Sequence, residues 1–467
     1  MLCSTTTISF AVPLFAEVLL MRTIIASIAT LLSGLTVFAA DPLPYKAGAA
    51  TKVITPAEPL WMAGYGNRNK PCDIKRHDLW VKALAIEDSA GNVGVLLTSD
   101  LCGIPRGMGE DVTKEVSKKI GLKREQIMLT CSHTHCGPVV KENLIDMYPL
   151  TPEQAEAVKV YTQKLRGWMV DVIVKAYESR QPAKLSIGKG TAGFAMNRRE
   201  VTPKGVINGR NPEGPVDHDV PVLRVEDEKG AVKAVVFGYA CHNTTMPFYE
   251  WCGDYAGFAQ IEVEKKHPGA VAMFWIGTGG DANPLPRGKI ELCEKYGKEL
   301  AAGVEDAMKN TMPLTAKLTT KYKEIAIDFD TIPGKDKWTA DLLSKSIAVE
   351  NRAKRMLKHL ENGGKIPDNY PYYPVQVWRF GEELTWVSLG GEVVIDYNIR
   401  LKKDWGKDKP LWVTGYANDV VAYIPSERVL KEGGYEGESS QVYYGHPTKW
   451  APSIEERIIK TVMELAK

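Results

Sequence analysis

The stretch REQIMLTCSHTHCGP, residues 124–138, contains the pattern that decides the fold: an apolar run followed at once by a polar turn. Residues 126–130 predict a buried strand. Side chains two positions apart in extended backbone point the same way, so His133 and His135 are expected to project together from its end. Strand ends that open into loops are where α/β proteins place most of their chemistry. A polar strand end without any chemistry is the alternative.

Short β-branched runs alternate with amphipathic helical stretches along most of the chain. The runs predict strands over residues 79–86, 93–98, 126–130, 184–187, 220–225, 232–239, 270–276, 384–389 and 411–415. Helices are predicted over residues 108–120, 151–179, 257–266, 289–309, 339–362 and 453–466, and loops over 201–217 and 363–374. Because no repeat or linker interrupts this alternation, we predict an α/β fold, one large mixed-sheet catalytic domain with helices packed outside.

The N-terminus has the layout of a secretory signal peptide. From Met21 a single arginine precedes an apolar run, residues 23–38, and small residues then lead into a polar stretch. We expect residues 1–40 to be a leader cleaved near Ala39, with Met21 as the true start, and residues 41–467 to form one catalytic domain. The alternative is a membrane anchor, for which the apolar run is short. The mature chain is therefore expected to be exported, either periplasmic or secreted.

Composition excludes several classes of function. The net charge is +2 with 25% charged residues, so there is no basic field to attract nucleic acid, and no nucleic-acid partner is expected. No GxSxG, HExxH or Walker A motif occurs. The nearest imitation of a phosphate loop, residues 277–281, is followed by Pro284 and Pro286 where a dinucleotide-binding fold begins a helix.

The cysteines show neither zinc-ribbon nor disulfide spacing. Setting Cys3 aside, an odd number remains of the chain's 8 cysteines, and most are expected to be small buried hydrophobic residues. Pairing of Cys241 with Cys252 stays open, since an exported protein forms disulfides.

Two further segments repeat the pattern of an apolar run that ends in a polar side chain. VVFGYACHNTT, residues 235–245, delivers His242, and LGGEVV, residues 389–394, presents Glu392 after a Gly-Gly turn. Two histidines and a carboxylate form a common catalytic zinc set that leaves coordination positions open for water. Together with residues 131–138, these segments indicate a metal centre built from three strand ends.

With these residues the chain resembles the catalytic domain of the neutral/alkaline, non-lysosomal ceramidases. The resemblance extends from about residue 47 nearly to the C-terminus. Its specific parts are SHTHCGP and YANDVVAYIPSERVLKEGGYEG. The matching segments are AGAATKVITPAEPLWMAGYGNRN (47–69), SHTHCGP (132–138), ACHNTT (240–245), GGDANP (279–284) and YANDVVAYIPSERVLKEGGYEG (416–437).

The resemblance implies a zinc amidase with a neutral-ceramidase-like fold. His133 and His242 match the family's histidine ligands of zinc, and Glu392 matches its carboxylate ligand. Tyr423 falls where the family places a tyrosine at the zinc.

The same resemblance implies the residues that act on the substrate. His135 and Arg198 match residues that face the scissile amide, and Tyr435 matches a second active-site tyrosine. An imidazole is a suitable general acid and base, and a fixed cation suits an oxyanion.

The chain departs from the family at three points. Asn283 stands where the ceramidases carry a serine sometimes assigned as nucleophile; an amide cannot be acylated in that way, so a covalent route is closed there, although Asn283 can still donate a hydrogen bond or hold the turn. Arg199 replaces a small polar residue and is expected to narrow the mouth of the site. The chain stops where the catalytic domain would, so the family's C-terminal β-sandwich domain is expected to be absent.

The expected function is zinc-dependent hydrolysis of the amide bond of N-acyl lipids, ceramide giving a sphingoid base and a fatty acid, with water activated by the metal. Two alternatives stay open: a zinc amidase or esterase acting on a non-lipid compound, and a non-catalytic family member. The aromatic residues 369–374 are expected to pack against one another, with an acyl groove or a peripheral membrane contact as the alternative.

Overall fold

The computed structural model describes residues 1–9, 43–406 and 409–467. The chain divides into two compact units, Met1–Pro42 and Leu43–Lys467, and residues 1–9 contain neither helix nor strand. The predicted signal peptide, with its start at Met21, lies outside the described residues. No helix in the described part of the chain is long and apolar enough to cross a membrane.

The second unit is organised around a nine-stranded mixed sheet with the order β10-β9-β8-β5-β1-β2-β3-β4 and with β12 beside β5. Its neighbours are antiparallel except for the parallel pairs β9–β10 and β3–β4. The strands are β1 (Tyr45–Val53), β2 (Trp80–Asp88), β3 (Val93–Ser99), β4 (Ile127–Leu129), β5 (Gln181–Thr191), β8 (Asp219–Glu226), β9 (Val232–Tyr239), β10 (Val271–Ile276) and β12 (Met312–Leu314).

A four-stranded sheet packs against one face of this sheet. It has the order β13-β14-β15-β17, formed by β13 (Leu318–Asp328), β14 (Asn369–Phe380), β15 (Leu384–Leu389) and β17 (Leu411–Thr414). Successive side chains in a strand point to opposite faces. Leu84 and Ile86 of β2 therefore join Trp386 in the core between the two sheets, whereas Val81 and Ala83 belong to the larger core under the helices.

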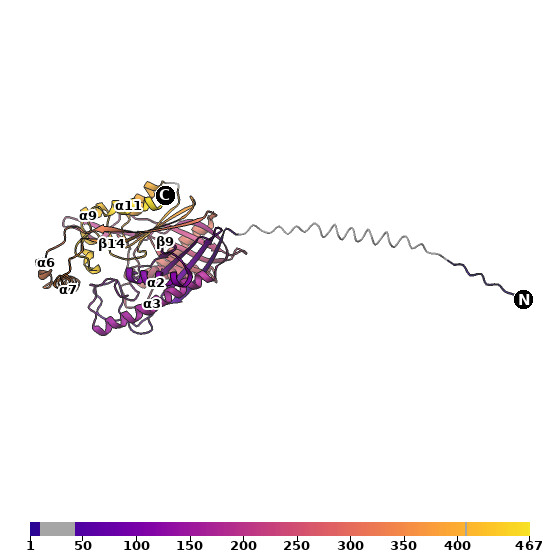
Figure 1. The fold of residues 1–467 in the computed structure, drawn as a ribbon, viewed down its shortest axis with the longest axis horizontal. Helices are drawn as coiled ribbons and strands as arrows, with labels where there is room; N and C mark the ends of the chain where they lie inside the picture. Colours follow the sequence, from indigo (N-terminus) through magenta and orange to yellow (C-terminus); the bar gives the residue numbers. More distant parts are fainter. Residues whose placement is uncertain (10–42, 407–408) are drawn as a thin grey trace. The chain divides into compact units, whose positions relative to one another are not determined.

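Helices cover both outer faces. α3 (Pro152–Glu178) lies on β1 and β2, α5 (Ile290–Lys309) lies on β5 and β8, and α11 (Ile454–Leu465) lies on β13 and β14. Figure 1 shows α2 (Arg106–Ile120) and α3 on one side of the strands and α11 on the opposite side. This four-layer arrangement confirms the predicted α/β fold, a mixed sheet with helices outside.

Glycines allow α5 to approach the sheet closely. A side-chain carbon added at Gly190 of β5 would lie 1.9 Å from the Gly303 carbonyl oxygen of α5, and one at Gly188 would lie 2.2 Å from the Ala307 carbonyl oxygen. Only a residue without a side chain fits at such a distance.

Shorter elements complete the second unit and carry most of the candidate site. They are β6 (Ala195–Thr202), β7 (Gly205–Asn211), β11 (Ala282–Pro284), β16 (Glu392–Val393), β18 (Tyr423–Ile424), α4 (Asp254–Lys266), α6 (Lys335–Asp341), α7 (Ile347–Glu361), α8 (Asp396–Trp405), α9 (Glu427–Glu432), α10 (Gly434–Gly437), and the 3₁₀ helices η1 (Arg124–Gln126) and η2 (Ser439–Tyr444).

Three element predictions were wrong. Residues 201–217, predicted as a loop, include the end of β6 and all of β7, and residues 363–374 include the start of β14. The helix predicted over 339–362 is broken into α6 and α7, because Ser344 and Ser346 turn the chain between them. Serine competes for backbone hydrogen bonds in this way when it lies inside a helical pattern.

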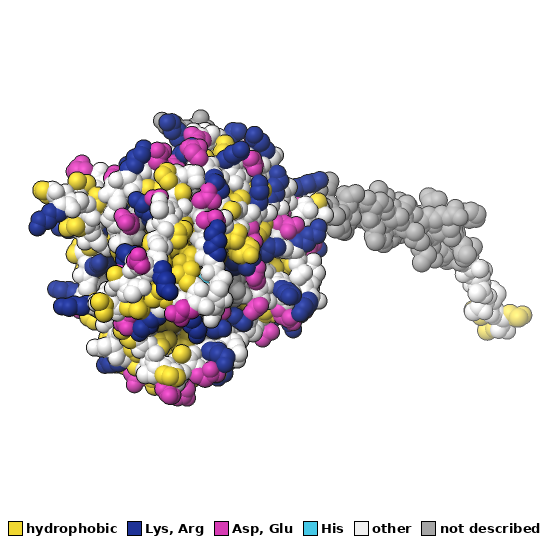
Figure 2. Space-filling model, turned by 60° about the vertical axis from the view of Figure 1, so that its left-hand side comes forward, with side chains coloured by type: hydrophobic (Ala, Val, Ile, Leu, Met, Phe, Trp, Pro, Cys, Tyr) yellow, Lys and Arg dark blue, Asp and Glu magenta, His cyan; other side chains and the backbone are white. Residues whose placement is uncertain are grey.

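The face drawn in Figure 2 carries basic and acidic side chains interspersed, with hydrophobic side chains gathered near its middle. All the cysteines are free, and every one except Cys3 is buried, so Cys241 and Cys252 are not paired.

The aromatic residues 369–374 lie at the start of β14. The Tyr373 hydroxyl donates to the Gly390 carbonyl (2.9 Å), and the Tyr370 hydroxyl donates to the Asp419 carboxylate (2.5 Å). Tyr372 remains exposed, 6.0 Å from the Tyr370 ring between centroids. The segment is therefore fastened to the body of the fold through two of its three tyrosines.

The buried Asp419 carboxyl predicts a pH-dependent stability. Burial, opposed by the hydrogen bond from Tyr370, raises the pKa of Asp419 from 3.8 to about 7. Between pH 4 and 7 the folded protein holds a proton that the unfolded chain has released, so the free energy of unfolding falls as the pH rises through this window. Asp419→Asn is expected to flatten this slope. Urea unfolding at a series of pH values measures it, with Asp306→Asn on the surface of α5 as control; equal slopes in the Asp419 variant and the wild type would contradict the assignment.

Candidate metal centre

Three chain segments that end or flank strands meet at one end of the sheets. The loops after β4 and β9 run side by side through a parallel bridge between Thr134 and Asn243. Glu392 of β16 is the parallel cross-strand partner of Tyr423 of β18. These pairings bring together segments that are far apart in the sequence, and each contributes a polar side chain to the same buried space.

The side chains of His133, His242 and Glu392 converge on one point. Glu392 Oε2 lies 3.0 Å from His242 Nε2 and 3.2 Å from His133 Nε2. One potential ligand atom from each of the three residues lies within 4.8 Å of the other two, and all three residues are buried. The structure thus brings together three of the four side chains predicted as metal ligands, and the hydroxyl of the fourth, Tyr423, lies 3.2 Å from His242 Nε2.

The local geometry at His133 differs from the prediction of a continuous strand. β4 already ends at Leu129, and His133 has a left-handed backbone with φ of +58°. His133 and His135 nevertheless face each other, with 3.1 Å between their Nε2 atoms. A turn, rather than the alternation of an extended strand, therefore brings the two rings together.

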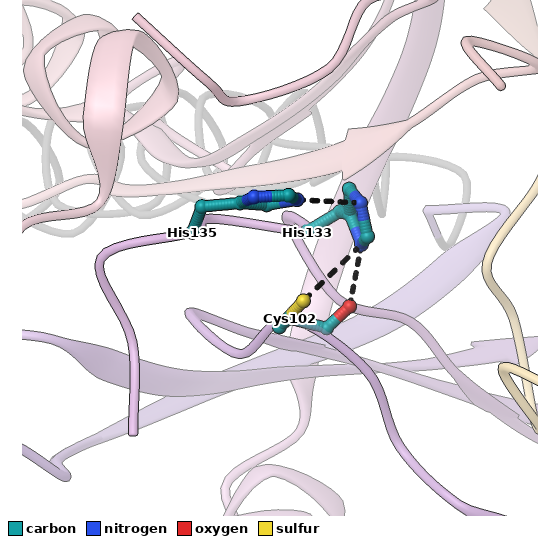
Figure 3. Close-up of side chains that lie close together, drawn as sticks. All are labelled: Cys102, His133 and His135. Atoms are coloured by element: carbon teal, nitrogen blue, oxygen red, sulfur yellow. Dashed lines mark hydrogen bonds between the residues drawn. The ribbon is translucent and has the colours of Figure 1, made fainter. Parts of the chain in front are cut away.

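Backbone carbonyls orient both predicted histidine ligands. His133 Nδ1 lies 2.6 Å from the Cys102 carbonyl oxygen, as Figure 3 shows, and His242 Nδ1 lies 2.7 Å from that of Gly279. Because a carbonyl only accepts, each Nδ1 carries the proton and each neutral ring presents a lone pair at Nε2. Two lone pairs then face a carboxylate oxygen, an arrangement that needs a cation or an extra proton. The donor set fits zinc, and histidines that ligate metals are held by such carbonyls.

The charges at this point are strongly coupled. Burial works to lower the pKa of His133, but the Glu392 carboxylate and Cys102 raise it to about 10. Burial and the Arg198 cation lower the pKa of His242 to about 4. A proton held at His133 beside Glu392 occupies the position that a cation would take, so protons and metal ions compete for this centre.

Glu392 has a third partner, which the sequence did not reveal. The Tyr444 hydroxyl donates to Glu392 Oε1, which leaves Oε2 for the histidines. Tyr444 lies in η2, outside every segment that suggested a ligand. A tyrosine inside a run such as SSQVYYG carries no sequence signal of this role.

Tyr444→Phe is expected to weaken metal binding by about 10–100-fold without unfolding the protein, because it removes a hydrogen bond that orients a ligand. Competition with a chelator of known affinity measures the change. Tyr443→Phe is the matched control, since it alters a neighbouring tyrosine of η2 whose hydroxyl does not bond Glu392. Equal metal affinity of the wild type and Tyr444→Phe would refute the role.

His135 lies beside the three convergent side chains and is the most exposed histidine of the group, at 9%. Burial and the charges of His133 and His242 hold the pKa of His135 well below 6.5, so its ring is neutral. Its Nδ1 has no protein partner. Gly64, in MAGYG, allows the ring its place, because a side-chain carbon there would lie 2.3 Å from the His135 ring.

Arg198 connects the remaining predicted site residues. Its Nη2 donates to the Tyr423 hydroxyl (3.0 Å), and its Nη1 donates to Asn283 Oδ1 (3.2 Å). The Tyr423 hydroxyl lies 3.2 Å from His242 Nε2, and the Tyr435 ring lies 5.2 Å from the Tyr423 ring between centroids. The structure therefore places all eight predicted site residues in one neighbourhood.

Arg199 does not narrow an opening, contrary to the expectation from sequence. Its side chain is only 2% exposed and bonds to Glu432 and Glu436. Glu436, like Cys102 and Tyr444, is a contributor that sequence analysis missed. These residues act through contacts between distant segments, for which no local motif exists.

The four-layer fold and the buried His–His–Glu set define the class, an α/β protein with a candidate metal centre at its strand ends. Residues 45–331, more than half of the chain, match the family described as "Neutral/alkaline non-lysosomal ceramidase, N-terminal". The chain belongs to this family.

Two curated relatives match part of the chain. The chain is 27% identical to neutral ceramidase A of Dictyostelium discoideum over 231 residues, which cover 44% of this chain and 31% of the relative. Neutral ceramidase B of the same organism matches with the same identity and coverage over 228 residues. The aligned part thus spans about a third of the length of either relative.

Two solved structures share the fold. The neutral ceramidase from Pseudomonas aeruginosa superposes with a TM-score of 0.70 at 19% identity, covering 91% of this chain and 74% of that one. A structure described as "Ceramidase complexed with C2" gives a TM-score of 0.69, also at 19% identity, covering 91% of this chain and 75% of the other.

Proposed function

We propose that this chain is a zinc-dependent hydrolase that cleaves the amide bond of N-acyl lipids, with ceramide as the leading substrate. The proposal depends on one observation: two imidazoles and a carboxylate converge beside a third imidazole that is neutral. Membership of the ceramidase family supports the reaction and the substrate class. Bound zinc would supply Lewis acidity and hydroxide at neutral pH.

His135 is suited to carry the proton. Its neutral ring can accept a proton from the water that attacks the amide carbon, and can then deliver it to the nitrogen that leaves. The amine is a poor leaving group without that proton. The products are a carboxylic acid and an amine, and the proton balance closes through one side chain.

Arg198 and the tyrosines are suited to the negative charge that develops on the carbonyl oxygen. Arg198 is a buried cation whose guanidinium contacts the Tyr423 hydroxyl. Burial holds the pKa of Tyr423 and Tyr435 well above 10, so both hydroxyls keep their protons and can donate them in hydrogen bonds. Donors fixed in advance of the reaction stabilise an oxyanion without the cost of reorienting solvent.

Asn283 favours water as the nucleophile. Its carboxamide cannot form an acyl intermediate in the manner of the family's serine, and its oxygen accepts a hydrogen bond from Arg198 (3.2 Å). In this proposal Asn283 orients the guanidinium and has no covalent role.

Asn283 also motivates the second candidate function, hydrolysis of a non-lipid N-acyl or ester compound by the same centre. Asn283 contacts Arg198, so asparagine in place of the family's serine alters the surroundings of the guanidinium more than those of the metal ligands. Export of the mature chain remains part of the proposal, and so does the assignment of residues 41–467 to a single catalytic domain.

A substrate panel after metal analysis tests the proposal. We expect about one zinc ion per chain, hydrolysis of long-chain ceramide, loss of activity with a chelator and recovery with added zinc. Cleavage of short polar amides or esters but not of ceramide would favour the second candidate. A zinc-loaded protein inert on every amide and ester would identify a non-catalytic family member.

A further inference from the structure

Tyr435 lies on a segment whose backbone does little to fix its own position. It belongs to α10, a single turn that begins at Gly434 directly after Gly433, and these two glycines have φ of +78° and +68°. Glycine adopts such left-handed conformations readily, but it also leaves the chain many other conformations. Contacts from outside the segment must therefore hold Tyr435 in place.

Besides the packing of the Tyr435 ring near Tyr423 and Tyr443, Arg199 supplies hydrogen bonds on both sides of Tyr435. Its Nη1 donates to Glu436 Oε2 (2.7 Å), and its Nη2 donates both to Glu432 Oε2 (3.0 Å) and to the Gly433 carbonyl oxygen (3.0 Å). One guanidinium thus bonds the residue after Tyr435, the residue two before it and the last residue of α9. The planar fork of arginine makes this three-way contact possible, whereas a lysine offers a single point charge.

We call the contacts of Arg199 with Glu432, Gly433 and Glu436 the clamp. Glu436 links this clamp to the candidate site. Its other oxygen, Oε1, accepts from Arg198 Nε at 2.7 Å, so one carboxylate bridges two buried guanidinium groups. Together with Glu432, whose side chain is 31% exposed, the network contains two positive and two negative charges. Loss of one partner of a buried ion pair destabilises a protein, because it leaves the other charge buried and unpaired. This network therefore favours a single arrangement of the segment.

The position held in this way is close to the predicted catalytic groups. The Tyr435 ring lies 5.2 Å from the Tyr423 ring between centroids, and the Arg198 guanidinium carbon lies 5.6 Å from the centre of the Tyr435 ring. Arg199 itself is 2% exposed and points away toward α9 and α10, so it has no route to a substrate.

We infer that Arg199 is a positioning residue, which acts on the reaction by holding the 432–436 segment so that Tyr435 lies over the site. The inference rests on the proposed function, in which Tyr435 contacts the scissile amide. Arg199 stands where the ceramidases usually carry a small polar residue, so the clamp is a feature of this chain's own sequence. It acts through Glu432, Gly433 and Glu436, and not by contact with the substrate.

A double-mutant cycle between Arg199→Met and Tyr435→Phe tests the clamp. In the otherwise wild-type protein, Arg199→Met is expected to lower kcat by about 10–100-fold, a loss typical of a misplaced catalytic group, with little change in KM. In the Tyr435→Phe background the same substitution should have almost no further effect. Equal losses in both backgrounds would show a merely structural role and overturn the inference.

Milder variants keep the test valid if Arg199→Met folds poorly. Arg199→Lys retains the charge and should recover part of the lost kcat, and Glu432→Gln removes only one arm of the clamp at a half-buried site. The clamp would be contradicted if Arg199→Lys recovered none of the lost kcat and Glu432→Gln left kcat unchanged.

Hydrogen exchange supplies a readout that needs no substrate. The amides of Gly433 and Glu438, which bond to Val429 and Gly434, are expected to exchange faster in Arg199→Met while those of α3 stay unchanged. Unchanged exchange at Gly433 and Glu438 would overturn the inference even if the enzyme cleaves ceramide. Faster exchange in a protein inert on every substrate would support the clamp and refute the proposed function.

Discussion

Alanine at His133 or at His242 is expected to empty the metal centre and to lower the rate of hydrolysis by at least about 100-fold. Substitution of residues that only hydrogen-bond to metal ligands already lowers metal affinity or activity by about 10–100-fold. Each substitution removes one of the two imidazoles that face Glu392. A buried carboxylate with one remaining histidine cannot satisfy the four-coordinate preference of zinc. The loss should therefore appear in the metal content before it appears in any rate.

Elemental analysis of the purified variants measures this effect, together with circular dichroism to establish that they fold. His267→Ala is the matched control, because His267 pairs with Glu305 on α5 and not with Glu392. Wild-type zinc content in His133→Ala or His242→Ala would remove that residue from the ligand set, whatever its effect on activity.

Alanine at His135 is expected to give the opposite combination: zinc is retained, and kcat falls by about 10²–10⁴-fold, the usual contribution of a positioned acid or base. His135 lies 3.1 Å from His133, and it belongs to the candidate metal group formed with Cys102 and His133, not to the group that contains His242 and Glu392. Its neutral ring and its unpartnered Nδ1 leave it free to exchange a proton.

Comparison of esters with amides sharpens this experiment. An alkoxide leaves more easily than an amine, so His135→Ala should harm amide hydrolysis more than hydrolysis of the matching ester. Tyr65→Phe, which changes a ring in edge contact with His135, serves as the control for packing. Full amidase activity in His135→Ala would show that His135 does not transfer the proton.

The sequence was most informative where a motif and a strand end coincide. His133, His135 and His242 could be chosen from apolar runs followed by polar turns, and the structure brings them together. His133 and His135 lie together as predicted, but a left-handed turn at His133, and not an extended strand, directs the two rings.

Residues whose role depends on long-range contacts could not be predicted. Tyr444 meets Glu392 across 52 positions, and Glu436 meets Arg199 across 237. Tyr423 and Tyr435 came only from resemblance, because 19 tyrosines give no basis for choosing two. The β6–β7 hairpin was missed because its Gly- and Asn-rich sequence also suits a loop.

The two-residue strands β16 and β18 have a consequence for how this protein can vary. Glu392 and Tyr423 are direct partners across a parallel ladder, so main-chain hydrogen bonds set the spacing of their α-carbons. The length of the intervening chain, with α8 and β17, does not enter that spacing. Insertions on the outer surface of that connection can therefore accumulate in evolution or engineering while the carboxylate and the phenol keep their separation. A one-residue register slip of either strand, by contrast, would turn that strand's own group away from the other.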